Sequence, residues 1–295
     1  MLRARSINAY AFFAFPLAVL VLFTLLPTIA GLALSLFQWD GGGRPVFIGL
    51  RNFRALFDDH RIGPALTNTL VYVVASVAPS VLLAFLLATA VHARWFRGKA
   101  LVRTMLFMPT IVSVVAIGFV WRWVLDPQAG LLNWLLSLVG IANTPDWLNE
   151  GSPMGWPLRW VVIVSIWRQV GFCVVLYLAA LSSVNESLYE AAELDGASRW
   201  KTLRHVTWPG VAPMTLFLMV TGVISALQVF DLVFVMGGRQ VGANLTVLNF
   251  EIYDQFGKGQ LGYAAAIGVV IFVLTLIATA AQLGLNRGER KEARA

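Results

Sequence analysis

Cysteine is nearly absent from this sequence, and charged residues are scarce. The chain has one cysteine, Cys173, among 295 residues, which excludes an internal disulfide and a cysteine-based metal cluster. We expect Cys173 to be a small apolar packing residue within a long hydrophobic segment. Charged residues make up 13% of the chain and hydrophobic residues 58%. This composition excludes an ordinary soluble domain with a polar surface.

Signatures of catalysis and of nucleotide or metal binding are also missing. The chain has no Gly-x-x-x-x-Gly-Lys-Ser/Thr phosphate loop, because Arg97-Gly98-Lys99 lacks the first glycine and the hydroxyl residue. It contains neither His-Glu-x-x-His nor Gly-x-Ser-x-Gly. A basic soluble domain for nucleic acid is missing too, although the formal net charge is +7. The sequence therefore predicts no enzyme, no metal site and no cofactor bound to this chain.

Long apolar runs are what the sequence has in place of these signatures. A helix needs about 20 apolar residues to cross roughly 30 Å of hydrocarbon. Six stretches meet or approach this length, and the first shows no cleavage site of a removable signal. The sequence predicts an all-α integral membrane protein with a single transmembrane domain, 1–295. The predicted spans are 9–37, 64–92, 102–125, 158–182, 209–235 and 261–285.

The basic residues predict how these spans are oriented. Lys and Arg accumulate in cytoplasmic segments, and thirteen of the 22 fall in the two tails and in the loops near 93–103 and 183–208. The first outer loop, with four arginines, works against this assignment, and the two tails decide it. We expect both termini and both loops to face the cytoplasm.

The segment from Gly130 to Ala142 competes for the role of a seventh span. Thirteen residues reach only about 20 Å as a helix, which is short of the hydrocarbon thickness. We expect an amphipathic helix on the outer interface instead, with packing as its main role. Its apolar positions are Leu131, Leu132, Trp134, Leu135 and Leu138.

The loop between the fourth and fifth spans reads as two short helices joined by a glycine. Ser187 followed by Glu190 is a capping-box pattern, and Gly196 is suited to a left-handed helix end. A second helix can begin at Ser198. The first helix, about 187–196, combines alanines that permit close approach with acidic side chains, which is typical of a docking element.

This loop resembles the cytoplasmic signature of the transmembrane subunits of binding-protein-dependent ABC importers. That signature is Glu-Ala-Ala, three residues, Gly, nine residues, Ile, one residue, Leu-Pro. Here Glu190-Ala191-Ala192, Gly196, Val206 and Pro209 stand at those spacings, with Trp208 in place of the usual leucine. The resemblance implies a type I ABC importer permease fold with a cytoplasmic coupling helix between spans four and five. The implied ATPase-coupling residues are Glu190, Ala191, Ala192, Asp195 and Gly196.

Three further stretches are similar to the carbohydrate-uptake branch of that family, near the maltose, oligosaccharide and glycerol-phosphate permeases. They are 47–53, 228–238 and 261–266. The resemblance implies a bacterial inner-membrane subunit that forms, with a second permease, the path for a sugar or oligosaccharide. It also implies an external solute-binding protein and two cytoplasmic ATPase subunits, which would bind the ATP and magnesium.

Polar residues within the spans are candidates for that path, because a buried charge is costly in a membrane and tends to face a cavity. Arg168 lies near the predicted midplane of the fourth span, and it either binds solute or pairs with a carboxylate of the partner permease. An anionic cargo and an ion-driven secondary transporter are the alternatives to sugar import. The candidate path residues are Ser165, Arg168, Gln169 and Phe172 on the fourth span, and Ser225 and Gln228 on the fifth.

Overall fold

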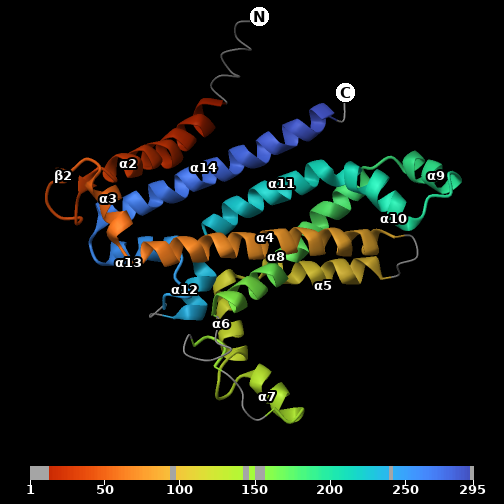
Figure 1. Ribbon diagram of the computed structural model, residues 1–295, viewed down its shortest axis with the longest axis horizontal. Coiled ribbons are helices and arrows are strands. Elements are labelled where there is room, and N and C mark those ends of the chain that lie inside the picture. The colour runs from red at the N-terminus through yellow and green to blue at the C-terminus, as the bar shows by residue number, and fades with distance from the viewer. Residues whose placement is uncertain (1–12, 94–97, 142–145, 150–156, 239–241, 293–295) are drawn as a thin grey trace, which may run out of the picture. The chain divides into compact units, whose positions relative to one another are not determined.

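The computed structural model describes the chain except residues 1–12, 94–97, 142–145, 150–156, 239–241 and 293–295. It is divided into two compact units. The first comprises Met1–Gly63 and Leu248–Val273, and the second comprises Pro64–Val247 and Leu274–Ala295. Figure 1 labels the helices and strands.

Five helices in the described residues are long and apolar enough to cross a membrane, and one bent pair makes a sixth candidate. The apolar runs form helices because, in a membrane, every backbone polar group of a span must be hydrogen-bonded within the helix. The five are Phe13–Leu34, which contains the π-helical turn Val21–Leu25 and α2 (Leu26–Leu34), α4 (Ile62–His92), α8 (Pro157–Ser182), Arg199–Leu227, and Leu261–Gly284 within α14 (Leu261–Glu292).

The predicted third span differs from a single helix. It consists of α5 (Lys99–Ile111) and α6 (Val114–Val124), whose axes differ by 97°. The break is at Val112 and Ser113, which both have extended backbone, with ψ of 141° and 134°. Pro109 in the last turn of α5 cannot donate a backbone hydrogen bond, which weakens the helix just before the break.

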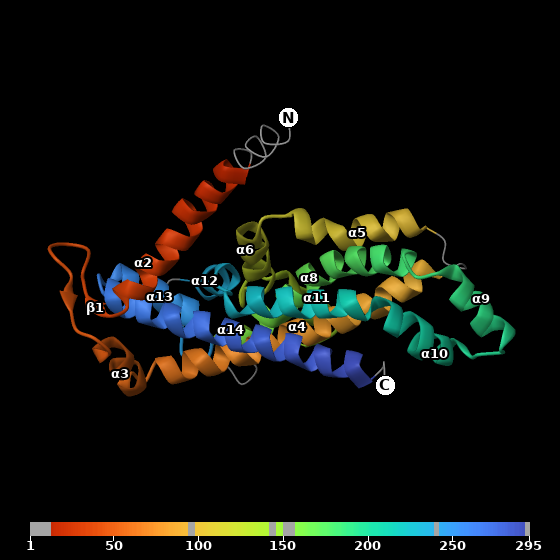
Figure 2. The same ribbon diagram turned by 90° about the horizontal axis from the view of Figure 1, so that it is seen from above.

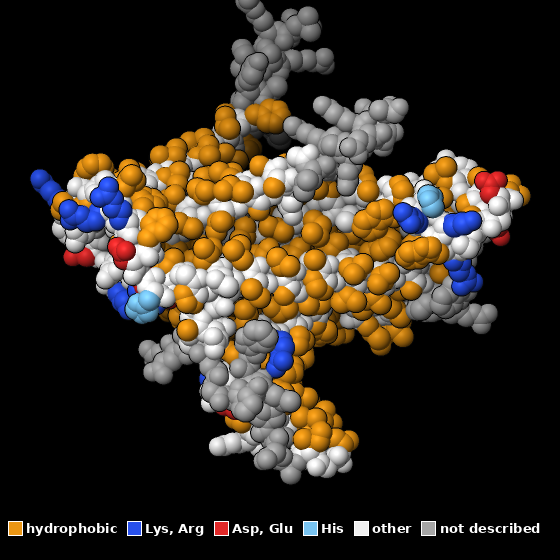
Figure 3. Space-filling model, in the orientation of Figure 1, with side chains coloured by type: hydrophobic (Ala, Val, Ile, Leu, Met, Phe, Trp, Pro, Cys, Tyr) orange, Lys and Arg blue, Asp and Glu red, His pale blue; other side chains and the backbone are white. Residues whose placement is uncertain are grey.

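In the second unit, α8 is the central helix. It packs against α5 and against α11 (Trp208–Leu227), while α6 packs against α12 (Asp231–Gly237). Figures 1 and 2 show α4, α5, α8 and α11 running alongside one another, with α6 and α12 away from the end where α9 (Glu186–Leu194) and α10 (Arg199–Thr202) lie. In Figure 3, hydrophobic side chains cover these long helices, and charged side chains gather around α9 and α10. The predicted interfacial helix is α7 (Leu131–Leu138).

In the first unit, buried hydrogen bonds connect the end of the first long helix to a small hairpin. Strands β1 (Phe37–Gln38) and β2 (Val46–Phe47) pair antiparallel. The amide of Asn52, in α3 (Arg51–Asp58), donates to the carbonyl oxygens of Ser35 (2.8 Å) and Phe37 (2.9 Å). Asn52 is buried, as buried polar side chains with hydrogen-bond partners can be, and its two bonds satisfy its amide N–H groups.

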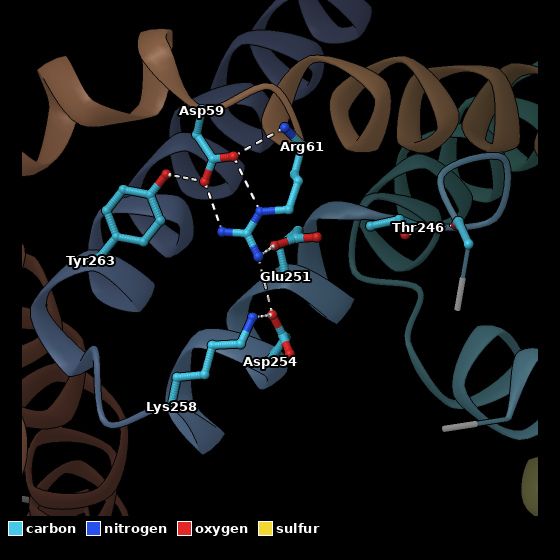
Figure 4. A network of polar contacts seen from close by, with 8 residues as sticks. Asp59, Arg61, Thr246, Glu251, Asp254, Lys258 and Tyr263 are labelled. Carbon is cyan, nitrogen blue, oxygen red and sulfur yellow. Dashed lines mark hydrogen bonds and ion pairs between the residues drawn. The ribbon is translucent and has the colours of Figure 1, made fainter. Parts of the chain in front are cut away.

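An ionic network joins two distant parts of the sequence within this unit (Figure 4). The guanidinium group of Arg61 pairs with Asp59 at 2.9 Å, with Asp254 at 3.3 Å and with Glu251 at 3.5 Å. Tyr263 donates to Asp59 Oδ2 at 2.9 Å. Glu251 and Asp254 belong to α13 (Leu248–Gly257) and Tyr263 to α14. The pair Asp59 and Arg61 thus connects the segment just before α4 to both later helices.

The carboxylates of this network respond differently to their surroundings. Hydrogen bonds from Arg61 lower the pKa of Asp59 from 3.8 to about 2. Burial raises the pKa of Glu251, although the positive charge of Arg61 acts in the opposite direction. Gln255 is also buried; with its amide turned to satisfy both ends, it accepts from Arg61 Nη2 at 2.7 Å. The arginine is therefore surrounded by acceptors.

Candidate translocation path and docking helix

A helix, α9, is present where the sequence predicts the docking helix. Its N-cap is Asn185, whose side chain accepts a hydrogen bond from the Ser187 backbone N–H at 3.1 Å. The predicted capping box with Ser187 as cap is therefore wrong; an Asx cap two residues earlier satisfies the same free backbone groups. Gly196 has φ of +66°, as a left-handed helix end requires. The second helix begins at Ser198, as predicted, and the Ser198 side chain is the N-cap of α10.

Much of α9 is exposed to solvent. Glu190, Ala191, Asp195 and Gly196 are exposed, and Ala192 is half-buried. Two apolar side chains share this exposure: Leu188 is 51% exposed and Leu194 is 89% exposed. Exposed leucines beside acidic side chains are typical of a surface that a partner covers.

A groove of about 920 Å³ lies beside this helix. It is bounded by α9 and by the ends of α4 and α8 nearest to it, and Glu190 and Glu193 line it together with His92. The hydroxyl group of Tyr189 also donates to Thr207 Oγ1 at 3.4 Å. These contacts hold α9 against the base of the long helices.

The second short helix is continuous with the fifth span. Residues Arg199–Leu227 form one helix, in which α10 leads through the π-helical turn Leu203–Thr207 into α11. Trp208, which replaces the usual leucine, packs its ring edge-on against Phe85 of α4, with ring centroids 5.1 Å apart. Movement of α9 therefore reaches α11 through the short turn around Gly196 and through the hydrogen bond from Tyr189 to Thr207.

A cavity of about 150 Å³ lies between α4, α8 and the end of α11. Five of the six candidate path residues line it, namely Ser165, Arg168, Gln169, Ser225 and Gln228. Phe172 does not line it: it lies a turn farther along α8 and is 39% exposed. The cavity is smaller than the roughly 300–1,000 Å³ of typical ligand pockets, so a disaccharide requires it to widen.

The contribution of α4 to this cavity was not predicted from the sequence. Tyr72, Ser76 and Ser80 line it, and the Tyr72 hydroxyl group is 2.7 Å from Ser165 Oγ on α8. Their i, i+4, i+8 spacing places the three on one helical face. That spacing is the signal in the sequence that could have identified α4 as a wall of the cavity. It is weak because the three residues are uncharged and lie in an otherwise apolar run.

Arg168 brings a positive charge to the cavity. Its backbone carbonyl accepts a hydrogen bond from Thr110 Oγ1 at 3.2 Å, which links α8 to α5. No ion pair of its side chain occurs within the part of the chain that the structure describes, although Asp231 lines the same cavity. Both predicted roles of Arg168, solute binding and pairing with a partner permease, are compatible with this position. In the described ranges no cluster of His, Cys, Asp or Glu could hold a metal ion.

Comparison with known proteins agrees with this architecture. Residues 71–291 match the model of the family described as "Binding-protein-dependent transport system inner membrane component". The probable ABC transporter permease protein YurN of Bacillus subtilis is 32% identical, over 99% of this chain and 100% of its own length. The diacetylchitobiose uptake permease NgcF of Streptomyces coelicolor is 33% identical, over 94% of this chain and 81% of its own. The lactose transport permease LacF of Rhizobium radiobacter is 32% identical, over 98% of this chain and 97% of its own length.

Solved structures show the same fold. A chain of a bacterial ABC transporter that imports the acidic polysaccharide alginate superposes with a TM-score of 0.85 and 25% identity, covering 96% of both chains. A second structure shows a bacterial alginate transporter in complex with a periplasmic protein bound to an alginate pentasaccharide. It superposes with a TM-score of 0.84 and 25% identity, covering 96% of this chain and 95% of that one. With a family model matching most of its length and relatives matching nearly all of it, this chain belongs to the binding-protein-dependent transport system inner membrane component family.

Proposed function

We propose that this chain is one of two permease subunits of an ATP-driven importer in the bacterial inner membrane, with both termini in the cytoplasm. The solute, a neutral sugar or oligosaccharide, is delivered by an external binding protein. Two cytoplasmic ATPase subunits dock on α9 and supply the energy, since this chain carries no phosphate-binding loop.

One observation supports this function above the others: a polar cavity and an exposed docking helix are connected by one continuous helix. The cavity includes Ser225 near the end of α11, and α9 joins the start of the same helix through the turn at Gly196. A displacement of α9 when the ATPases close therefore tilts a wall of the cavity. Alternating access needs such a two-state rigid element that both sites bias.

Contacts between the helices transmit this tilt. The hydroxyl group of Tyr177 on α8 donates to Thr215 Oγ1 on α11 at 2.9 Å. Tyr177 also packs edge-on against Phe85 of α4, at 5.7 Å between ring centroids. The helices α4, α8 and α11 are thereby in contact at a level between the cavity and α9, so that a tilt of α11 is passed on to α8 and α4.

The names of two relatives favour a neutral cargo over an anionic solute, although the two solved structures belong to transporters of the acidic polysaccharide alginate. NgcF is named for diacetylchitobiose and LacF for lactose, and both sugars are uncharged. A cavity with hydroxyl, amide and guanidinium groups can donate and accept hydrogen bonds to sugar hydroxyl groups. Arg168 then acts as a hydrogen-bond donor to the sugar.

The proposal is tested on the complete complex, purified through a tag on the ATPase subunit. Glu190→Arg places a positive charge where we expect an ATPase arginine, and we expect recovery of this permease to fall at least about tenfold. Glu193→Arg is the matched control, because it makes the same charge change one turn away on the same exposed helix. We expect it to weaken recovery much less.

Three results bear on the proposal. Selective loss with Glu190→Arg supports docking through α9. Equal recovery of both variants and the wild type contradicts it. The cargo is tested separately, by ATP-dependent uptake of lactose, maltose and diacetylchitobiose into proteoliposomes that contain the reconstituted complex and its binding protein. Uptake of none of these sugars contradicts the proposed cargo class.

A further inference from the structure

A single hydroxyl group on α4 differs from the other hydroxyl groups of that helix. Thr69 Oγ1 donates to the carbonyl oxygen of Ala65 at 2.7 Å, and Ser76 Oγ donates to that of Tyr72 at 2.6 Å. Each hydroxyl group is thus satisfied by the residue four positions earlier in its own helix. Ser80, one turn beyond Ser76, has no hydrogen-bond partner for its Oγ among the described residues.

Ser80 is also deeply buried, with 1% of its surface exposed. A buried hydroxyl group without a partner costs free energy, and such groups call for a specific explanation. Lipid offers no hydrogen bond at this position. Water or a solute within the cavity can supply the partner, and Ser80 is one of the residues that line the cavity.

The two other hydroxyl groups that α4 brings to the cavity already have hydrogen-bond partners. The Tyr72 hydroxyl group is engaged with Ser165 Oγ at 2.7 Å, and the Ser76 hydroxyl group with its own helix. Ser80 is thus the hydroxyl group of α4 that is left available on this wall. A hydroxyl group both donates and accepts, so it matches the hydroxyl groups of a sugar.

We propose that Ser80 is a specificity-determining residue of the translocation path, which hydrogen-bonds to one hydroxyl group of the neutral sugar from the α4 wall. This rests on the proposed function. A sugar that lacks this hydroxyl group leaves Ser80 unpaired again, and sites built around a buried hydrogen bond discriminate against such analogues. The candidate residues on α8 and α11 then share the recognition with a third helix.

The test uses the complete importer reconstituted in proteoliposomes, with whichever of lactose, maltose and diacetylchitobiose the wild type takes up, and with the monodeoxy derivatives of that sugar. We expect Ser80→Ala to lower kcat/KM for uptake of the parent sugar about tenfold, mainly through KM. One deoxy derivative, which the wild type takes up about tenfold less efficiently, should enter Ser80→Ala as efficiently as the parent sugar. Ser80→Thr, which keeps a hydroxyl group, should restore the discrimination.

Thr69→Val is the matched control. It removes one buried hydroxyl group from the same helix, at a position that does not line the cavity. We expect it to discriminate among the deoxy sugars as the wild type does.

Two outcomes overturn the role of Ser80 while leaving the proposed function intact. In one, Ser80→Ala retains the wild-type discrimination against every deoxy derivative. In the other, it lowers uptake of the parent and of all derivatives by the same factor, which indicates a purely structural hydroxyl group. If the wild-type complex itself accumulates none of the three parent sugars, the cargo proposed above fails, and the proposal for Ser80 fails with it.

Discussion

At Gly171 of α8, the backbone of α5 leaves no room for a side chain. A Cβ atom at this position would stand 1.8 Å from the carbonyl oxygen of Leu106 and 3.2 Å from the Cα of Phe107. Ordinary contacts of a Cβ atom begin at 3.4 Å, so Gly171→Ala requires the two helices to separate by about 1.6 Å. The atom in the way belongs to the backbone, so no side-chain rotation can relieve the clash.

The size of the effect can be ranked against two other helical glycines. Overpacking a close contact costs about 1–3 kcal/mol, and we expect Gly171→Ala to reach the upper end. At Gly222 a Cβ atom would meet Val77 Cγ1 at 2.9 Å, a side chain that can rotate, so we expect about 1 kcal/mol. At Gly284 nothing lies within 4 Å, and alanine should stabilise the helix by about 0.5–1 kcal/mol.

Thermal unfolding of the purified chain in lipid nanodiscs, followed by tryptophan fluorescence, measures this order. We expect Gly171→Ala to have the lowest melting temperature, followed by Gly222→Ala and the wild type, and Gly284→Ala to have the highest. Gly171→Ala should also impair uptake, because Arg168 is one turn from this contact on the same helix. A Gly171→Ala protein as stable as Gly284→Ala would refute the close packing of α5 on α8.

Two further predictions concern the ionic network and the docking helix. The pKa of Asp59 is lowered to about 2 from 3.8, so its ion pair stabilises the fold above about pH 4 and is lost as the pH falls towards 2. The melting temperature of the wild type should therefore fall over that interval more steeply than that of Asp59→Asn; equal slopes would contradict the assignment. Asn185→Ala removes the N-cap of α9 and should destabilise that helix by about 1 kcal/mol, which is measured as faster amide hydrogen exchange over 186–194. Asn185→Ser keeps a capping oxygen and should exchange like the wild type; equally fast exchange in both variants would exclude a capping role.

The sequence predicted the elements that depend on local patterns. Long apolar runs marked the helices, and the glycine at 196 marked the left-handed end of α9, because both signals lie in the residues themselves. The 97° break between α5 and α6 was missed. Its local signal, Pro109 close to Ser113, is ambiguous because proline is tolerated within membrane helices.

Features that depend on packing could be predicted only in part. Helical periodicity identifies which residues share a face, and five of the path candidates do line one cavity. Periodicity does not say how far the cavity extends along a helix, and Phe172 lies beyond it. The role of Ser80 depends on which hydroxyl groups are already bonded, which only coordinates show. The network around Arg61 joins residues up to 204 positions apart, such as Asp59 and Tyr263, and no local pattern marks it.

The central claim, that α9 projects into the cytoplasm and is covered by the ATPase subunits, is tested most directly by thiol labelling. Cys173, the single cysteine, is buried and can be replaced by alanine. A cysteine is then introduced in place of Leu194, which is 89% exposed on α9, and, as the opposite-side control, in place of Phe57, which is 91% exposed on α3. The account predicts that a membrane-impermeant maleimide labels Leu194→Cys only from the cytoplasmic side and that bound ATPase subunits block this labelling, whereas Phe57→Cys reacts from outside. Labelling of Leu194→Cys from outside intact cells, or undiminished labelling in the assembled complex, would contradict it.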